Sequence, residues 1–166
     1  MTGSGAGEAF ARVVTPHLPA AYRLALWLLR DPATAEDVTQ DAAERAFRHI
    51  ATFRGDNARA WLLRIVRNQA METLSKTRPS AALDDEWPDQ SPLADAALLR
   101  AEGESALHAA LAALPPPLRE CLVLRELEEC SYRDIAEIVG IPIGTVMSRL
   151  WKARQTLMAE TEALRA

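Results

Sequence analysis

The strongest pattern of apolar and polar positions lies in residues 131–157, with the sequence SYRDIAEIVGIPIGTVMSRLWKARQTL. Two groups of apolar residues recur at helical spacing and predict two short helices with one buried side each: Ile135, Ala136, Ile138 and Val139, then Val146, Leu150, Ala153 and Leu157. Ser131, with Asp134 three residues later, has the spacing of a capping box. Gly140 and Pro142 predict a tight turn between the helices, because glycine tolerates a left-handed backbone and proline cannot continue a helix.

The second of these helices has a polar outer face that suits contact with DNA. Its outward residues are Thr145, Ser148, Trp151, Lys152 and Gln155, with Arg149 and Arg154 at the edges. Two helices joined by a short turn are the layout of a helix-turn-helix, in which the second helix enters the major groove. The alternative is a helical hairpin inside a bundle, with a solvated basic face. The short turn and three cations between residues 149 and 154 favour DNA binding.

A second periodic segment, residues 34–50, predicts a helix with two different sides. Thr34 and Asp37 have capping spacing, and the buried side is expected to hold Val38, Ala42, Ala46 and Ile50. The opposite side carries a polar stripe of Asp37, Gln40, Asp41 and Glu44, followed by Arg48. Such stripes are usually solvated surface, and spacing alone favours that interpretation. A docking face for another protein is the alternative.

A loop at residues 53–57 precedes a cationic helix. Gly, Asp and Asn predict the loop, and the helix is expected to bury the side that holds Trp61, Leu62, Ile65 and Val66. Residues 54–78 contain 6 basic and 2 acidic residues, a net charge of +4. A cationic helix beside an aromatic loop can follow a single strand of nucleic acid and hold an unstacked base. Phe53 and Trp61 could instead be ordinary core residues, a common role for aromatic side chains.

The rest of the chain predicts further helices around an acidic linker. Residues 1–9 are rich in Gly and Ser and are expected to be disordered. Helices are expected at about residues 10–30, with breaks near Pro16 and Pro19, at about residues 92–113, and after the three prolines 115–117. The core side of the last helix is expected to hold Leu118, Leu122, Leu124 and Leu127. Residues 79–104 predict a flexible linker, in which Trp87 is unusual.

The charge distribution fits two helical domains that flank this linker, residues 10–78 and 105–166. The linker holds 7 acidic residues and one Arg, whereas residues 1–78 hold 11 basic and 8 acidic residues. The overall net charge of −4 therefore hides local basic patches that a polyanion would meet. The chain has only Cys121 and Cys130, no run of 18 apolar residues and no secretory signal. These features predict a cytoplasmic protein with no membrane insertion. Abundant Ala and Leu and the helical periodicities predict an all-α fold.

No cluster of residues predicts catalysis or a bound cofactor. His17, His49 and His108 lie far apart in the sequence, and no group has the spacing of metal ligands. A Gly-rich loop that cradles phosphate is also missing from the sequence. We therefore expect neither an enzyme nor a metalloprotein.

The chain resembles a bacterial sigma factor of the sigma-70 family, extracytoplasmic-function (ECF) group, in three motifs. They are AEDVTQDAAERAF at residues 35–47, RAWLLRIVRNQA at residues 59–70, and residues 114–157 with the helix-turn-helix. The resemblance covers nearly everything from about residue 20 to residue 157. It implies promoter recognition and transcription initiation by a dissociable subunit of bacterial RNA polymerase. Residues 10–78 would be sigma region 2 and residues 105–166 sigma region 4.

The resemblance also implies a role for each polar surface. The stripe of Asp37, Gln40, Asp41 and Glu44 would dock on the polymerase core. The loop and cationic helix would recognise and melt the −10 element through Phe53, Arg54, Asp56, Asn57, Trp61, Arg64, Arg67 and Asn68. The helix-turn-helix would read the −35 element through Arg133, Thr145, Met147, Ser148, Arg149, Trp151, Lys152 and Arg154. The implied partners are RNA polymerase core, promoter DNA that is double-stranded at −35 and melted at −10, and an anti-sigma factor.

Met147 departs from the family pattern, because many relatives carry Lys or Arg at this point of the recognition helix. Methionine can touch a thymine methyl group but cannot donate a hydrogen bond to guanine. Two other functions stay open. A sigma mimic that titrates an anti-sigma factor would fit the lost donor at Met147. A plain helix-turn-helix repressor would need neither the acidic stripe nor the melting helix.

Overall fold

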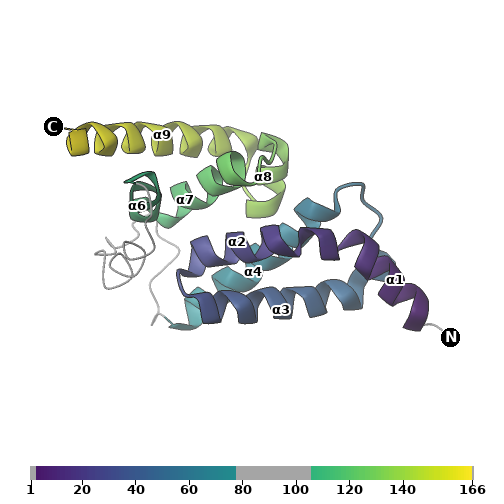
Figure 1. Ribbon diagram of the computed structural model, residues 1–166. Helices are drawn as coiled ribbons and strands as arrows, with labels where there is room; N and C mark the ends of the chain where they lie inside the picture. Colours follow the sequence, from purple (N-terminus) through teal and green to yellow (C-terminus); the bar gives the residue numbers. More distant parts are fainter. Residues whose placement is uncertain (1–2, 78–105, 166) are drawn as a thin grey trace.

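The computed structural model describes residues 3–77 and 106–165, and within these ranges every regular element is a helix (Figure 1). The predicted all-α class with two helical domains is therefore confirmed. The N-terminal unit contains α1 (Gly3–Val13), the 3₁₀ turn η1 (Thr15–His17), α2 (Leu18–Leu29), α3 (Pro32–His49), the 3₁₀ turn η2 (Ile50–Thr52) and α4 (Ala58–Thr77). The C-terminal unit contains α6 (Ala106–Ala113), α7 (Pro116–Leu122), the π-helical turn η3 (Val123–Leu127), α8 (Tyr132–Val139) and α9 (Ile143–Arg165). None of the described helices is long and apolar enough to cross a bilayer.

The N-terminal unit is built on three helices, α2, α3 and α4, that pack against one another. The buried side of α3, with Val38, Ala42 and Ala46, and Ile50 in η2 are as the sequence predicts. On α4 the buried residues are Leu62, Leu63, Val66 and Ala70, so the prediction is confirmed for Leu62 and Val66 only, while Trp61 and Ile65 are half-buried. Alanine at several of these positions lets the helix backbones approach closely. The helix expected at residues 10–30 is divided by η1 at Pro16. The position of Pro19 in the first turn of α2 is compatible with that helix, because the first amides have no partner there.

Two predictions about the N-terminal unit are wrong. The cap of α3 is Asp31 and not Thr34: the Asp31 carboxylate accepts a hydrogen bond from the backbone N–H of Thr34 at 3.0 Å. Residues expected to be disordered are helical from Gly3 onward. Helix α1 is held because Phe10 makes an edge-to-face contact with Phe47, with ring centroids 5.5 Å apart.

The C-terminal unit contains the predicted helix-turn-helix, formed by α8 and α9. The Ser131 hydroxyl accepts a hydrogen bond from the Asp134 backbone N–H at 3.1 Å, so the predicted cap is confirmed. Gly140 has φ +77° and ends α8 in the left-handed conformation that glycine tolerates. Val146, Leu150 and Ala153 are buried, as the periodicity of α9 predicts.

One turn of π-helix interrupts the region between α7 and α8. In η3 the Glu128 backbone N–H donates to the Val123 carbonyl, five residues back, and not to the residue four back. The wider turn shifts the helix face. Leu127, predicted to be core, is therefore 43% exposed, whereas Glu128 is turned inward and only 1% exposed. The predicted linker, Trp87 and the expected helix start near residue 92 lie outside the described residues.

The two units lie against each other, with α8 on α4 and α7 on α2. Figure 1 shows α3 and α9 on opposite outer sides of the molecule, and the contact between the units lies between these two helices. Trp27 of α2 and His108 of α6 meet across this contact, with ring centroids 4.9 Å apart. The outer faces of α3 and α9 therefore stay open to solvent.

Candidate nucleic-acid interfaces

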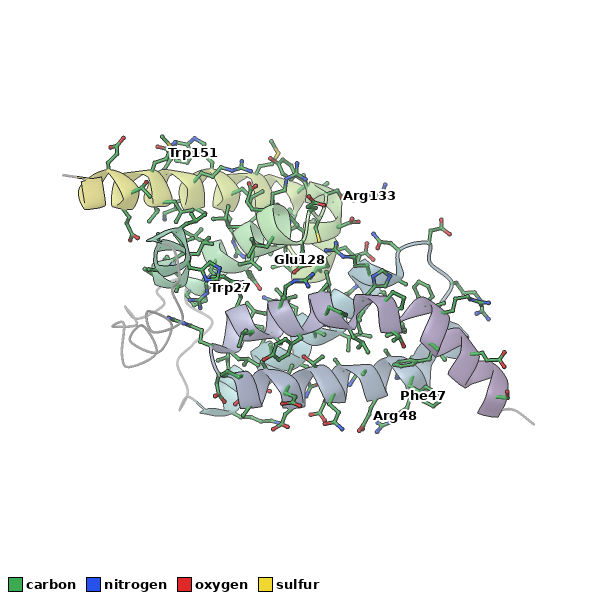
Figure 2. All side chains as sticks on the ribbon, viewed as in Figure 1. Trp27, Phe47, Arg48, Glu128, Arg133 and Trp151 are labelled. Carbon is green, nitrogen blue, oxygen red and sulfur yellow. The ribbon has the colours of Figure 1, made fainter. Side chains whose placement is uncertain are left out.

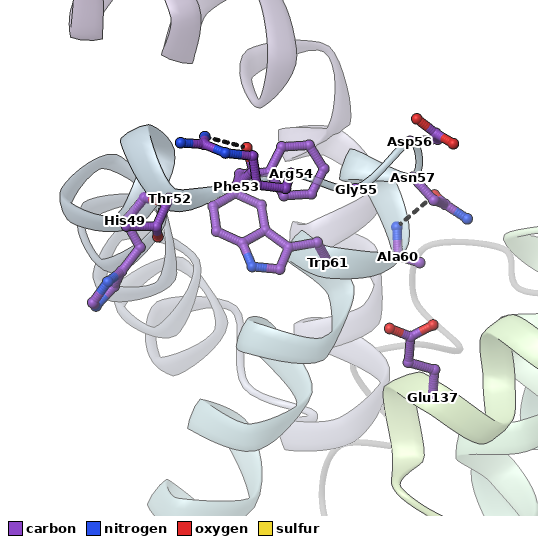
Figure 3. A pocket seen from close by; sticks show the side chains of 10 residues that line it. All are labelled: His49, Thr52, Phe53, Arg54, Gly55, Asp56, Asn57, Ala60, Trp61 and Glu137. Atoms are coloured by element: carbon purple, nitrogen blue, oxygen red, sulfur yellow. Dashed lines mark hydrogen bonds between the residues drawn. The ribbon is translucent and has the colours of Figure 1, made fainter.

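The loop between η2 and α4 forms an open cleft beside an aromatic pair. The rings of Phe53 and Trp61 are 4.7 Å apart and inclined by 31°. The Asn57 side-chain oxygen accepts a hydrogen bond from the Ala60 N–H at 3.0 Å and so caps α4. The cleft has a volume of about 580 Å³, and Figure 3 shows its lining residues: His49, Thr52, Phe53, Arg54, Gly55, Asp56, Asn57, Ala60, Trp61 and Glu137.

This cleft has the parts needed to hold an unpaired base. Half-buried aromatic rings offer a stacking surface, and its volume lies in the range of small-molecule sites. The Arg54 guanidinium donates to the carbonyls of Ala51 and Phe53 at 2.7 and 3.2 Å, so the cation is held on the loop. The structure thus brings together five of the residues predicted for the −10 interface: Phe53, Arg54, Asp56, Asn57 and Trp61.

The other three residues predicted for the −10 interface lie further along α4 and do not share one environment. Arg64 and Asn68 are exposed and four residues apart, so they lie on one face of the helix. Arg67 turns toward the C-terminal unit. Its Nε and Nη2 donate to the two carboxylate oxygens of Glu120 at 3.0 and 3.2 Å.

The exposed face of α9 carries most of the residues predicted to read the −35 element. Met147 and Trp151 are 54% and 66% exposed, one helical turn apart, and Lys152 is exposed beside them. Ser148 is exposed too, and its hydroxyl donates to the Gly144 carbonyl at 2.9 Å. Thr145 is half-buried at the start of the helix, whereas Arg133 of α8 is exposed. Figure 2 shows Trp151 and Arg133 on the outer side of the C-terminal unit.

Two arginines predicted for this face make ion pairs within the protein. Arg149 points inward, with a side chain only 24% exposed and Nη1 3.9 Å from Glu120. Arg154 donates to the Glu126 carboxylate at 2.9 Å, and this hydrogen bond raises the pKa of Arg154 above its usual value. A DNA phosphate would therefore compete with Glu126 for Arg154, while the inward position of Arg149 does not suit a phosphate contact.

Helix α3, which carries the polar stripe, lies on the side of the molecule away from the C-terminal unit (Figure 1). Asp37, Gln40, Asp41 and Glu44 are all exposed, and Glu44 pairs loosely with Arg48 at 3.7 Å. A shallow groove of about 360 Å³ adjoins the stripe, lined by Phe10, Gln40, Ala43, Glu44, Phe47 and Arg48. Phe47 is 45% exposed there, so the surface offers both charge and an apolar contact.

Metal and thiol chemistry find no support in the part of the chain that the structure describes. No three His, Cys, Asp or Glu side chains gather in a way that could hold a metal ion there. Burial raises the pKa of Cys121 to about 11, and it also raises the pKa of Cys130. Both thiols therefore stay protonated and inert at neutral pH.

Comparison with known proteins decides the family. The sequence models of Sigma-70 region 2 and of Sigma-70, region 4 match residues 13–79 and 104–157. The RNA polymerase sigma-H factor of Pseudomonas aeruginosa is 35% identical over an alignment of 168 positions, which covers 92% of this chain and 86% of the relative. The ECF RNA polymerase sigma-E factor of Escherichia coli strain K12 is 33% identical over an alignment of 141 positions, which covers 77% of this chain and 74% of the relative. The chain belongs to the sigma-70 family of sigma factors, ECF group.

A solved structure of another sigma factor has the same arrangement of helices. The sigma factor RpoE from Bartonella quintana, in complex with the anti-sigma factor NepR, aligns with a TM-score of 0.71 and 27% identity. The alignment covers 92% of this chain and 96% of that chain. In this sigma factor the cleft and the stripe on α3 therefore belong to region 2, and the exposed face of α9 belongs to region 4.

Analysis of the sequence missed two carboxylates at the contact between region 2 and region 4. The side chain of Glu128 is fully buried, and that of Glu120 is 3% exposed. Glu120 could have been noticed, because it lies in the apolar run LRECLVL, where an unpaired charge would be costly. Its partners could not have been predicted, because Arg67 lies 53 residues away along the chain.

Proposed function

We propose that this sigma factor is the promoter-recognition subunit of bacterial RNA polymerase in transcription initiation. Region 4 would read the −35 element in duplex DNA with α9, and the region 2 cleft would capture an unpaired base of the −10 element. The observation that carries the proposal is the pairing, in one chain, of an aromatic-lined cleft with an exposed recognition helix. The protein would act in the cytoplasm and would supply no catalysis of its own.

The stripe on α3 would dock this subunit on the polymerase core. Its support is geometric, because Asp37, Gln40, Asp41 and Glu44 are exposed on a face that neither DNA interface uses. Phe47 and the neighbouring groove would add an apolar contact to the charged one. An exposed charge by itself contributes little binding energy, so stable binding to the polymerase core needs both the charged and the apolar contact.

An anti-sigma factor would be a second protein partner. The support is that RpoE, which is similar over nearly the whole chain, is solved in complex with the anti-sigma factor NepR. RpoE bound to NepR and this protein have the same fold. The proposed anti-sigma partner is tested by finding a protein that binds this sigma factor and lowers transcription by polymerase that carries it.

Run-off transcription with purified core polymerase on genomic fragments tests the function. Wild type is expected to give discrete start sites, and Asp41→Lys with Glu44→Lys is expected to abolish core binding and transcripts while the fold is kept. Glu72→Lys with Glu162→Lys is the matched control, because both side chains are exposed and the charge change is the same. Core binding without transcripts would indicate a sigma mimic. The absence of both core binding and transcripts would indicate a repressor. An unchanged core affinity of the Asp41/Glu44 variant would overturn the docking assignment.

A further inference from the structure

The exposed side of α9 carries a row of apolar residues at the end of the helix that would enter DNA. Ile143, Met147 and Trp151 are 46%, 54% and 66% exposed, and they follow one another at intervals of four residues. Each interval turns the helix by about 40° beyond a full turn, so the three side chains lie within an arc of about 80°. Their positions span about 12 Å along the helix axis, which matches the width of the major groove. The apolar row therefore covers the part of α9 that a groove can hold.

The apolar row is not part of the hydrophobic core. The core side of α9 is formed by other residues, Val146, Leu150 and Ala153. Single apolar residues on a surface are ordinary, whereas a contiguous exposed group of them marks a contact surface. In a helix-turn-helix, the N-terminal half of the second helix meets the edges of the bases. The apolar row thus lies where base edges would be read.

Two arginines near the apolar row are engaged within the protein. Arg149 points inward, with Nη1 3.9 Å from Glu120. Arg154 donates to the carboxylate of Glu126 at 2.9 Å. Ser148 donates its hydroxyl hydrogen to a backbone carbonyl of its own helix at 2.9 Å. The reading face therefore offers apolar surface where arginine would offer hydrogen bonds to guanine.

The major groove presents one apolar group that such a surface can recognise. Each base pair shows hydrogen-bond donors and acceptors there, and the C5 methyl group of thymine is the apolar feature. Cytosine that is methylated at C5 carries the same group at the same position of the pyrimidine ring. Thymine and cytosine differ in the groove at O4 and N4, to which apolar side chains cannot bond. Side chains that recognise the methyl group thus accept both thymine and 5-methylcytosine.

We propose that α9 recognises C5-methylated pyrimidines in the −35 element through Ile143, Met147 and Trp151, so that 5-methylcytosine is equivalent to thymine as a ligand. Methylation of a −35 cytosine then strengthens the contact of region 4 with the promoter, and transcription from that promoter responds to the modification. The proposal rests on the proposed function of α9, and it adds the chemical class of the bases that this helix prefers.

Promoter duplexes with modified −35 pyrimidines test the proposal. The protein is the full-length sigma factor bound to purified core polymerase, and the promoter is one found by run-off transcription. Each −35 pyrimidine, on either strand, is replaced in turn by thymine, uracil, cytosine and 5-methylcytosine, with the matching purine opposite. Uracil is thymine without its methyl group, so the four bases vary the methyl group and the hydrogen-bonding edge independently. The −10 element is left unmodified, so melting contributes equally to the affinity for every duplex.

Affinity should follow the methyl group at the positions that the apolar row contacts. We expect thymine and 5-methylcytosine to bind alike and about 4-fold more tightly than uracil and cytosine, which is the factor for burying one methyl-sized group. Tighter binding of 5-methylcytosine than of uracil is decisive, because uracil keeps the hydrogen-bonding edge of thymine. Equal affinity for thymine and uracil at every −35 position would overturn the proposal, and so would equal affinity for cytosine and 5-methylcytosine.

Variants of the apolar row assign the preference to its side chains. Met147→Ala and Trp151→Ala should each bring the ratio of thymine to uracil affinity toward 1. Met158→Ala is the matched control, because Met158 is 56% exposed on the same helix but lies about 22 Å from Ile143 along the axis, beyond the N-terminal half. The ratio is measured within one protein, so a change in the folded fraction cancels. Loss of the ratio in Met158→Ala as well would overturn the assignment.

Failure of this proposal can be distinguished from failure of the proposed function. Discrete start sites with no response to the methyl group would overturn the proposal alone, and region 4 would then read the −35 element by other contacts. The absence of any start site would overturn both. Unchanged affinity of Trp151→Ala for every duplex would show that Trp151 does not face DNA, and the apolar row would then be a surface for a protein partner.

Discussion

Replacing Met147 by arginine should change which base this sigma factor prefers at one position of the −35 element. Met147 is 54% exposed in the second turn of α9, and Trp151 lies on the same face one turn later. The substitution should therefore cost almost nothing in stability. A new bidentate bond from arginine to guanine is worth about 1–3 kcal/mol of discrimination, which corresponds to about 5-fold to 150-fold. Wild type is expected to prefer thymine or adenine at this position, because methionine offers only an apolar contact.

The measurement is binding to a library of duplexes that vary over the −35 element, at one fixed salt concentration. Met158→Arg is the matched control, because Met158 is 56% exposed on the same helix and the substitution adds the same charge. A base contact should raise affinity only for guanine at one position, whereas a phosphate contact should raise it for all sequences equally. If Met147→Arg raises affinity evenly, as Met158→Arg is expected to do, residue 147 does not face the bases. The register of the recognition helix would then be wrong.

Four further predictions follow from single positions. Arg64→Ala should leave −35 duplex binding intact and reduce open-complex formation; a wild-type permanganate footprint of the bubble would contradict this. Gly140→Ala should lower the free energy of unfolding in urea by about 1 kcal/mol, because alanine is strained at φ +77°. Steric contact is not the cause, since no atom lies within 4 Å of the added methyl group. Gly140→Asn should lower the free energy of unfolding less than Gly140→Ala. Leu150→Ala should cost about 3 kcal/mol in the same assay, since this side chain is 1% exposed, and a loss below about 1 kcal/mol would argue against its core position. Burial and, to a smaller extent, the charge of Arg59 lower the pKa of His17 in the folded protein, so the unfolded chain binds the proton more readily. The free energy of unfolding should therefore fall as the pH drops below 6.5 through the lowered pKa. His17→Gln should weaken this dependence of the free energy of unfolding on pH.

The sequence predicts well those features that depend on neighbouring residues. The cap at Ser131, the left-handed stop at Gly140 and the buried stripe of α9 all involve residues within one or two turns of each other. Their physical causes, an orphan amide, a positive φ and a 3.6-residue period, can be found in a short window. The cap of α3 was misplaced for a related reason: Thr34 and Asp31 both fit, and the choice depends on Pro32, which suits the first turn.

The features that sequence analysis missed depend on residues far apart in the chain. Helix α1 is held by the contact of Phe10 with Phe47, and neither residue identifies the other in a periodicity pattern. Burial of Glu128 depends on Arg23, 105 residues away. The inward turn of Arg149 was missed as well, because helical spacing alone placed it at the edge of the DNA face. Five residues of the cleft, by contrast, were predicted together, because they all lie within residues 53–61: Phe53, Arg54, Asp56, Asn57 and Trp61.

The π-helical turn η3 makes this part of the chain sensitive to its length. Each residue of an α-helix advances by about 100° around the axis, so the loss of one residue within Val123–Leu127 would return the turn to α-helical bonding and rotate all that follows. Glu128 would then leave the contact with region 2, and α8 and α9 would change direction together. Substitutions within η3 can keep the direction in which the following residues point, whereas the deletion of a single residue cannot. We therefore expect the number of residues between Leu122 and Ser131 to be under stronger selection than most of the side chains that fill it.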